Sequence, residues 1–354
     1  MTNHINLGSD TVTKPTEAMY DAMRRAELGD DGREGDPTVR QLEERAAEIT
    51  GKEAGLFVPS GTMANLVALL AHAQRGGEVL LDAEAHFLRS EMGGIAAVAG
   101  LFHRPVPGKR GAIDIDAVRA MIRPKIARNK MPTALVTVET SHNSAGGAVM
   151  GVDYLTALGA VAQEHGVPFH IDGARLFNAA VKLGVSAAAV AKPADSVCFC
   201  ISKGLSAPFG SLLCGSAEFI ERSRAFRRMV GGGMRQAGVM AAAGLVAFDQ
   251  MIDRLAEDHA RAAQLAAGIA RIDADIVDPS PQTNIVMVDV SRTGADAQRW
   301  LAALRAEGVI AGEWTPTQLR FVTHRHIDDA AVEQALAVFR KVYEGFKPNL
   351  AAAQ

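Results

Sequence analysis

This sequence of 354 residues has little net charge, few cysteines and no long apolar run. The net charge is only -3 at pH 7, which argues against nucleic acid or an anionic membrane as the main partner. No apolar run approaches the roughly 18 to 20 residues that a membrane span requires. The opening residues Met1 to Asn6 lack the basic and then apolar pattern of a signal peptide. We therefore expect a cytoplasmic protein.

The few cysteines point the same way. Cys198 and Cys200 stand at alternate positions of one apparent strand, so they share a face, and with Cys214 they cannot make up a disulfide framework. This also favours the cytoplasm. His324 and His326 alternate in the same manner, but no third metal ligand is evident. We expect no metal site.

The length and patterning are those of a large α/β protein. At 354 residues the chain is too long for one simple core. Continuous apolar strands alternate with helices up to about Gly244, which predicts a mostly parallel sheet covered on both faces. A smaller strand–helix–strand–helix pattern follows. We expect a large domain at 1–250, including an N-terminal arm, and a small α/β domain at 251–354.

The periodicity also predicts the individual elements. The first part of the chain is expected to hold helices at 37–50, 61–72, 93–100 and 154–165, and strands at 54–58, 78–81, 134–140, 167–171, 196–201 and 211–214. The last part is expected to hold helices at 245–272, 295–307 and 328–343, and strands at 284–290 and 319–323.

Two strand ends about 30 residues apart carry the most specific chemistry, a spacing typical of a repeated strand–helix unit. The first strand closes on Asp172, with Arg175 three residues on, and the second is followed by Lys203. Pyridoxal phosphate (PLP) requires an Asp that holds its ring nitrogen protonated and a Lys that binds its aldehyde covalently. Arg175 could reach the O3′ oxygen or the phosphate of the same cofactor. The sequence therefore predicts a PLP enzyme.

Each of these residues also has a structural interpretation. Asp172 could be the N-cap of a helix at 173–181. Arg175 could lie on the surface of that helix, and Lys203 could be an ordinary loop residue. The three together, in this order, favour the cofactor.

Further candidates lie at other strand ends. Ser60, Gly61 and Thr62 form a strand-to-helix turn whose N–H groups could cradle a phosphate. His86 could stack on the cofactor ring, and either His86 or His142 could serve as the acid–base group.

Two arginines complete the candidates. Arg320, on a strand of the C-terminal part, could bind a substrate carboxylate with its guanidinium fork. Arg228 precedes the glycine-rich stretch 231–236. That stretch could be a solvated hinge, or it could bring Arg228 near a phosphate, including that of a neighbouring subunit.

These motifs together resemble the low-specificity L-threonine aldolases, PLP enzymes of fold type I within the β-eliminating lyase group. The matching segments run through nearly the whole chain and are residues 8–16, 36–39, 57–65, 170–178, 202–205 and 231–236. Such enzymes are typically homotetramers whose sites are shared between subunits.

The resemblance implies a role for each candidate residue. Lys203 would bind the cofactor covalently, Asp172 would bind its ring nitrogen, and Arg175 would lie beside Asp172. His86 would stack on the face of the ring. The phosphate would be bound by Ser60, Gly61 and Thr62, with Arg228 approaching from a partner subunit. The substrate carboxylate would be bound by Ser9, Arg175 and Arg320. His142 would lie near the β-hydroxyl.

The reaction expected from this resemblance is retro-aldol cleavage of L-threonine-like or L-allo-threonine-like β-hydroxy-α-amino acids to glycine and an aldehyde. The same cofactor chemistry leaves β-elimination and a transaldolase reaction open. A homologue that binds PLP without turnover is a further alternative, which the intact set of candidate residues disfavours.

Two positions depart from the family pattern. Arg33 stands where an aromatic residue is usual, and Arg89 lies in the run that is usually rich in aromatics after His86. Both could simply face solvent. The alternative is that they recognise a substrate with an anionic β-substituent, such as a 3-hydroxyaspartate-like acid.

Overall fold

A computed structural model describes residues 4–346, apart from residues 124, 127–128 and 279. Contacts divide the chain into two compact units. The larger unit holds Lys14–Ala145 and Val149–Ile252; the smaller holds residues 4–13, Gly146–Ala148 and residues 253–346. The N-terminal residues thus group with the C-terminal part of the chain, whereas the expected large domain included them. The expected boundary at residue 250 stays a prediction.

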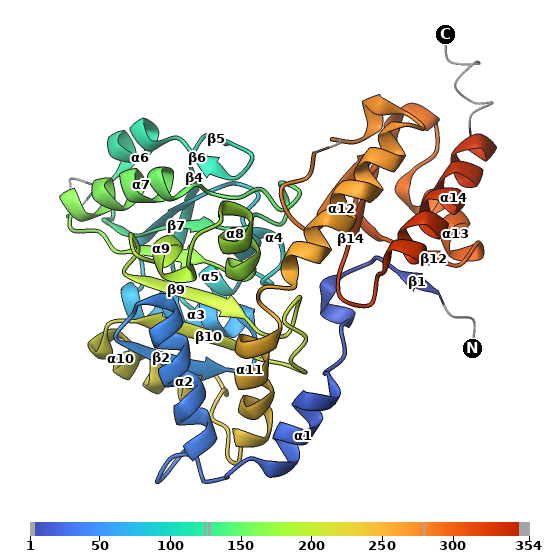
Figure 1. Cartoon of the computed structure of the whole chain (residues 1–354). Helices are drawn as coiled ribbons and strands as arrows, with labels where there is room; N and C mark the ends of the chain where they lie inside the picture. The colour runs from blue at the N-terminus through green and yellow to red at the C-terminus, as the bar shows by residue number, and fades with distance from the viewer. Residues whose placement is uncertain (1–3, 124, 127–128, 279, 347–354) are drawn as a thin grey trace. The chain divides into compact units, whose positions relative to one another are not determined.

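The larger unit is built on a seven-stranded sheet with the order β2–β10–β9–β8–β7–β3–β4 (Figure 1). Its strands are β2 (Ala54–Val58), β3 (Glu78–Leu81), β4 (Phe102–Pro105), β7 (Thr133–Glu139), β8 (Phe169–Asp172), β9 (Ser196–Cys200) and β10 (Ser211–Gly215). Strand β10 is antiparallel to both of its neighbours, and the other pairs are parallel. The prediction of a mostly parallel α/β sheet is confirmed. A short hairpin, β5 (Gly108–Lys109) with β6 (Ala112–Ile113), lies outside it.

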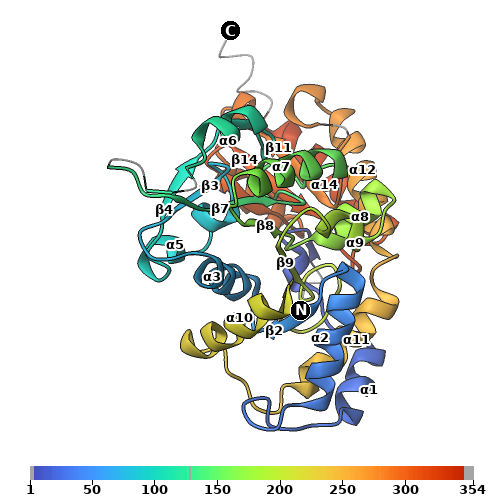
Figure 2. The same cartoon turned by 90° about the vertical axis from the view of Figure 1, so that its left-hand side faces the viewer.

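Helices cover both faces of this sheet. They are α1 (Glu17–Arg25), α2 (Pro37–Thr50), α3 (Gly61–His72), α4 (His86–Arg89), α5 (Gly94–Ala97), α6 (Ile115–Met121), α7 (Val152–Glu164), α8 (Leu176–Leu183), α9 (Ala187–Ala191), α10 (Ala217–Met229) and α11 (Gly238–Gln250). Alternate residues Leu56 and Val58 of β2 pack in one core with α3 and α10, which lie side by side in Figure 2. Gly55 points the other way, where a Cβ would lie 2.5 Å from the Glu43 carbonyl of α2.

Local signals set the ends of helix α2. Asp36 is its N-cap and accepts a hydrogen bond from the N–H of Val39 at 3.0 Å. Pro37 occupies the first helical position, and Gly51 ends the helix in the left-handed conformation at φ 64°. The predicted range 37–50 is confirmed to the residue, as are the helix at 61–72 and the strands at 54–58 and 78–81.

Two expectations about elements are wrong, and one structural alternative is excluded. The helix at 93–100 shrinks to Gly94–Ala97, because Gly93 and Gly100 adopt positive φ on either side of it. Asp172 is no N-cap, since α8 begins only at Leu176. The long helix at 245–272 is two helices, with residues 251–254 between α11 and α12. That break coincides with the boundary between the two units, where the chain leaves one core and enters another.

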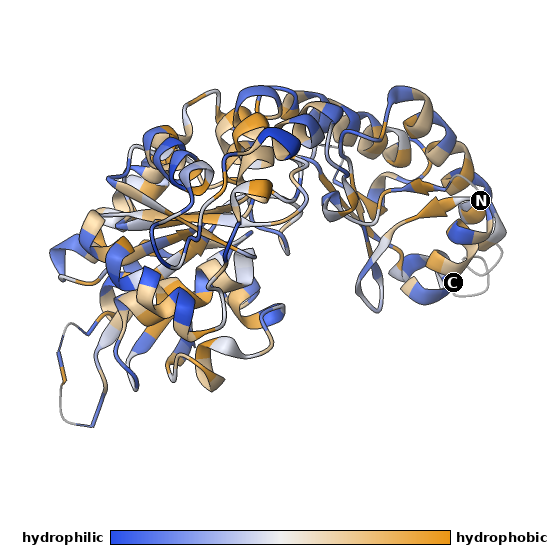
Figure 3. Ribbon diagram, turned by 90° about the horizontal axis from the view of Figure 1, so that it is seen from below, coloured by the Kyte–Doolittle hydropathy of each residue, from blue (hydrophilic) through white to orange (hydrophobic). Residues whose placement is uncertain are grey.

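The smaller unit has its own sheet and core. Its strands are β11 (Ile285–Asp289), β13 (Gly312–Thr315) and β14 (Gln318–Val322) in one antiparallel sheet, and β1 (Ile5–Asn6) paired in parallel with β12 (Val309–Ile310). Its helices are α12 (Leu255–Ala270), α13 (Ala297–Ala306) and α14 (Asp329–Phe346). Trp300, Phe321 and Phe339 lie in its core. Hydrophobic residues are concentrated on the strands in Figure 3. Among the residues described, no helix combines the length and the hydropathy of a membrane span.

Candidate active site

The candidate site lies along one edge of the seven-stranded sheet. Strands β9, β8, β7 and β3 are parallel neighbours, so their carboxyl ends meet at the same edge. Asp172 is the last residue of β8, and Lys203, His142 and Asp82 stand one to three residues beyond the ends of β9, β7 and β3. Asp172 is in register with Glu139 of β7 and Cys198 of β9. The topology therefore gathers residues that are far apart in the sequence.

Asp172 is the buried acid of this edge. It is 1% exposed; its Oδ2 accepts a hydrogen bond from Asn65 Nδ2 at 2.8 Å, and its Oδ1 accepts one from the N–H of Ala174 at 3.1 Å. Burial alone would raise its pKa, but the charge of His86, the Asn65 hydrogen bond and the charge of Lys203 together lower that pKa. The carboxylate is therefore ionised at neutral pH, as a partner for a protonated ring nitrogen must be.

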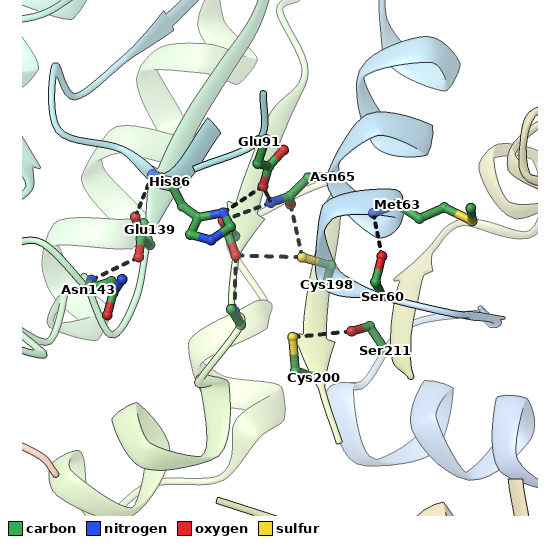
Figure 4. Close-up of polar contacts among 12 residues, drawn as sticks. Ser60, Met63, Asn65, His86, Glu91, Glu139, Asn143, Cys198, Cys200 and Ser211 are labelled. Carbon is green, nitrogen blue, oxygen red and sulfur yellow. Dashed lines mark hydrogen bonds and ion pairs between the residues drawn. The ribbon is translucent and has the colours of Figure 1, made fainter. Parts of the chain in front are cut away.

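His86 is held beside Asp172 by a second buried acid. Its Nδ1 lies 2.7 Å from Glu91 Oε1, and the same oxygen accepts a hydrogen bond from Asn65 Nδ2 at 2.7 Å (Figure 4). Burial lowers the pKa of His86, but the Glu91 hydrogen bond and the Asp172 charge outweigh burial and raise it above 6.5. Sequence reasoning assigned no role to Asn65 or Glu91, although Asn65 stands in the segment 57–65 that carries the family resemblance.

His142 is almost completely enclosed, with 1% of its surface exposed. Its Nδ1 accepts a hydrogen bond from the N–H of Ala145 at 3.3 Å, so the ring proton belongs on Nε2. That Nε2 lies 3.2 Å from Asp82 Oδ1 and 3.8 Å from Glu139 Oε2. Burial lowers the pKa of His142, but the hydrogen bond to Asp82 and the charge of Glu139 raise it overall. Neither carboxylate was among the residues expected from the sequence.

Lys203 lies in the turn that follows β9. The strand ends at Cys200, one residue earlier than expected, and Lys203 is half-buried. The turn is held by hydrogen bonds from the N–H of Ser206 to the Lys203 carbonyl at 2.9 Å and from the N–H of Ala207 to the Ile201 carbonyl at 3.0 Å. The positive charge of Lys203 contributes to lowering the pKa of Asp172, so the amine and the acid interact electrostatically.

Ser60, Gly61 and Thr62 form the N-terminus of α3. The Ser60 hydroxyl accepts a hydrogen bond from the N–H of Met63 at 3.2 Å (Figure 4). A Cβ at Gly61 would lie 2.8 Å from Cys200 Sγ, so the backbone passes close to the end of β9 only because this residue is glycine. The first-turn N–H groups and the helix dipole suit an anion such as a phosphate.

The expected carboxylate-binding residues fall in both units. In the larger unit, Arg175 is buried, and its Nη1 lies 3.4 Å from Asn143 Oδ1. In the smaller unit, the Ser9 hydroxyl accepts a hydrogen bond from the N–H of Thr11 at 3.2 Å. Arg320 of the same unit donates from Nη2 to the Gly8 carbonyl at 3.3 Å. Ser9 and Arg320 thus share one local structure, while their relation to Arg175 stays a prediction.

The other three candidate arginines, Arg33, Arg89 and Arg228, lie on the surface of this chain. The Arg33 side chain is 79% exposed, with its Nε 3.7 Å from Asp30 Oδ2. Arg89 pairs with Glu84 at 3.4 Å, and both side chains are about half exposed. Arg228 lines a cavity of about 370 Å³. Four further arginines line the same cavity, namely Arg33, Arg224, Arg227 and Arg235.

This donor set fits PLP. It offers an ionised buried acid for the ring nitrogen, an imidazole beside that acid, a helix N-terminus for the phosphate and a lysine amine that interacts electrostatically with the acid. The Nδ1 or Nε2 atom of His86 and carboxylate oxygens of Glu91 and Asp172 also lie within 4.8 Å of one another. That cluster is already joined by Asn65. The fold and the site define a PLP-dependent enzyme of fold type I.

The comparisons with known proteins identify the family. The model of the β-eliminating lyase family matches residues 6–293, and the chain belongs to that family. A probable low-specificity L-threonine aldolase 2 of Arabidopsis thaliana is 41% identical over 344 residues, which cover 96% of this chain and 97% of the relative. A low specificity L-threonine aldolase of Escherichia coli K12 is 38% identical over 340 residues, covering 95% and 98%.

Solved structures show the same fold. A putative L-allo-threonine aldolase of Listeria monocytogenes superposes with a TM-score of 0.78 at 20% identity, covering 96% of each chain. The threonine aldolase of Leishmania major superposes with a TM-score of 0.82 at 18% identity, covering 96% of this chain and 99% of the other.

Proposed function

We propose that this protein cleaves L-threonine, L-allo-threonine and similar β-hydroxy-α-amino acids between Cα and Cβ, giving glycine and an aldehyde. The observation that carries this proposal is the pairing of Asp172, buried and ionised, with His86 and Lys203 at the edge of the sheet. The relatives at 38–41% identity, which are threonine aldolases by name, support the reaction type.

The residues of the larger unit bind and orient the cofactor. When bound, PLP supplies an electron-poor ring that accepts the electron pair of the broken Cα–Cβ bond. Lys203 would hold the cofactor through its side-chain amine. Asp172 would keep a proton at the ring nitrogen because its carboxylate stays ionised, and His86 would lie against the ring. Ser60, Gly61 and Thr62 would bind the phosphate.

Two sets of residues act on the substrate. Ser9, Arg175 and Arg320 bind its carboxylate and so orient the Cα–Cβ bond for cleavage. His142 is the acid–base group near the β-hydroxyl. His142, or a water that it orients, removes the proton of the β-hydroxyl. The negative charges of Asp82 and Glu139, 3.2 Å and 3.8 Å from His142 Nε2, stabilise the positive charge that the imidazole then carries.

We also propose that the enzyme is a cytoplasmic homotetramer whose sites are shared between subunits. Arg228 then reaches the cofactor phosphate of a neighbouring subunit. The cavity lined by five arginines supports this arrangement: one acid, Asp31, also lines it and pairs with Arg227, and the remaining excess of positive charge suits a dianionic group.

A substrate with an anionic β-substituent is the second candidate. It rests on Arg33, whose guanidinium is only loosely paired, with 3.7 Å between its Nε and Asp30 Oδ2. Arg89 offers less support, because Glu84 already pairs with it. Neutral substrates are therefore the first expectation.

The test is a substrate panel on the purified holoenzyme. L-threonine, L-allo-threonine, phenylserine and 3-hydroxyaspartate are compared for release of glycine and aldehyde, and for release of pyruvate and ammonia. The proposal expects glycine from the neutral substrates, and Lys203→Ala is expected to lose the covalently bound cofactor and nearly all activity. Pyruvate and ammonia as main products would indicate β-elimination instead. A variant that kept full activity would remove Lys203 from its role.

A further inference from the structure

The side chain of Asn65 occupies the centre of the cofactor-facing residues, in a position that the cofactor roles above leave unexplained. It projects from α3 and is 2% exposed. Its Nδ2 donates to Asp172 Oδ2 at 2.8 Å and to Glu91 Oε1 at 2.7 Å. Its Oδ1 accepts from Cys198 Sγ at 3.1 Å. An amide has two N–H donors, so both are used, one on each buried carboxylate.

A series of hydrogen-bonded neutral side chains fixes which way the Asn65 amide points. Asn65 Oδ1 also lies 3.3 Å from His170 Nε2, which must carry the proton because a carbonyl oxygen only accepts. His170 Nδ1 then accepts from the Ser196 hydroxyl at 2.8 Å, and that hydroxyl accepts from His72 Nε2 at 2.7 Å. Burial lowers the pKa of His170 to about 4 and that of His72 to about 3, so both rings stay neutral.

The donors of this hydrogen-bonded series therefore point toward Asp172, while the second Asn65 N–H binds Glu91. The order runs from His72 through Ser196 and His170 to the Asn65 carbonyl, and from the Asn65 amino group to the carboxylate. A flipped amide would set its N–H groups against His170 Nε2–H and the Cys198 thiol, and its oxygen against two carboxylates. Buried polar groups left unpaired in that way are costly, so one orientation is selected.

The second N–H reaches His86 indirectly. It binds the same Glu91 oxygen that receives His86 Nδ1, so the position of Glu91 sets the plane and the tautomer of the imidazole (Figure 4). Burial is the main reason that the pKa of Glu91 is raised, and the nearby charge of Asp172 adds to it. The Asn65 amino group is thus the bridge between two buried acids that would otherwise repel.

We propose that Asn65 is a positioning residue that fixes both groups facing the cofactor ring, Asp172 directly and His86 through Glu91. It does not touch the reacting atoms. This inference rests on the proposed function only because the two groups that Asn65 fixes are those proposed to contact the cofactor. The hydrogen-bond network itself is present in the protein without cofactor.

The test compares Asn65→Ala with the wild type in three measurements. Losing a hydrogen bond to a buried charged group corresponds to roughly a 10- to 100-fold loss, which we expect in the affinity for PLP. The visible circular dichroism of the bound cofactor should weaken, because the ring is no longer held in one orientation. In the cofactor-free protein, the midpoint pH of the NMR titration of the His86 ring should differ from that of the wild type.

Two further variants keep the test decisive if Asn65→Ala folds poorly. Ser196→Ala interrupts the hydrogen-bonded series without touching the amide and should shift the same signals in the same direction by a smaller amount. Asn284→Ala is the matched control, since this buried asparagine also donates to a carboxylate, Asp10 Oδ2 at 3.2 Å, but in the smaller unit. It should lower thermal stability and leave the His86 titration unchanged.

The outcomes separate this inference from the proposed function. Asn65→Ala that loses thermal stability as Asn284→Ala does, yet keeps its PLP affinity within twofold and the His86 titration of the wild type, would show a merely structural role. A wild type that forms no glycine from any substrate would overturn the proposed function, while the titration of the cofactor-free protein would still decide the role of Asn65.

Discussion

The Nε2 atom of His142 lies 3.2 Å from Oδ1 of Asp82, inside a shell that leaves the imidazole 1% exposed. Asp82 follows β3 and His142 follows β7, and these strands are parallel neighbours. The pair is therefore a product of sheet topology. Its consequence is that the acid–base behaviour of the imidazole depends on a carboxylate 60 residues away in the sequence.

The first prediction concerns that carboxylate. Asp82→Asn keeps the shape of the side chain but removes its charge, so the pKa of His142 should fall. We expect kcat for L-threonine to decrease by about tenfold or more, within the usual range for acid–base groups, and its pH profile to move toward lower pH. Steady-state kinetics between pH 5 and pH 9, with an NMR titration of His142, measures both.

Glu84→Gln is the matched control for this change. Glu84 stands two residues further on, is about half exposed and pairs with Arg89, so its charge should not affect the profile. If Asp82→Asn gave the wild-type pH profile, the proton on His142 would not be governed by Asp82.

The second prediction concerns the glycine that covers the His142 ring. A Cβ at Gly111 would lie 2.3 Å from His142 Cδ2, and the residue has a φ of +85°. Gly111→Ala should therefore displace the imidazole and reduce kcat strongly, while PLP still binds. Gly166→Ala carries the same backbone penalty of about 1–2 kcal/mol at φ +65°, but no atom of the residues that the structure describes lies within 4 Å of its Cβ.

Equal losses of kcat in Gly111→Ala and Gly166→Ala would contradict the prediction, because they would trace the effect to backbone strain alone. Absorbance of the bound cofactor in each variant distinguishes a displaced acid–base group from a lost cofactor.

Local signals explain why much of the fold could be predicted. Helix α2 carries Asp36, Pro37 and Gly51 at its ends, and these residues act through their own backbone neighbours. The residues next to the parallel strand ends could be predicted for a similar reason, since topology alone brings the ends together. The break at residues 251–254 could not, because an uninterrupted helical pattern does not reveal where one core ends and another begins.

The supporting network could not be predicted from the sequence because it is tertiary. Asn65 reaches Glu91 across 26 residues and Asp172 across 107 residues. Asn and Glu are common residues with no signal of their own, and their roles emerge only where three separate elements converge. The N-cap interpretation of Asp172 failed for the opposite reason, since the helix it would have capped starts three residues too late.

The third prediction concerns substrate charge. Arg33→Ala and Arg89→Ala should each change kcat/KM for L-threonine by less than about threefold, because one side chain is 79% exposed and the other pairs with Glu84. The ratio of kcat/KM for 3-hydroxyaspartate to that for L-threonine is the measurement. A tenfold fall of this ratio in Arg33→Ala alone would instead establish Arg33 as the residue that recognises an anionic substrate.

The fourth prediction concerns stability at low pH. Burial lowers the pKa of His72 from 6.5 to about 3. Between these values the unfolded chain binds a proton at this position and the folded chain does not, so the unfolding free energy decreases as the pH falls. The stabilisation is complete above pH 6.5 and is lost progressively toward pH 3, by on the order of a few kcal/mol in all.

His72→Gln tests this directly. Glutamine can still donate to Ser196 but does not titrate, so the thermal unfolding midpoint of the variant should fall less steeply from pH 7 to pH 4 than that of the wild type. The variant is expected to be the less stable protein at pH 7 and to approach or exceed the wild type at pH 4. His103→Gln, which removes an exposed histidine of β4, should follow the wild-type curve. Parallel curves for His72→Gln and the wild type would mean that proton uptake by the unfolded chain at His72 does not drive the acid loss of stability. The slope would then come from other buried groups whose pKa is lowered by folding, among them His170, His324 and Asp172.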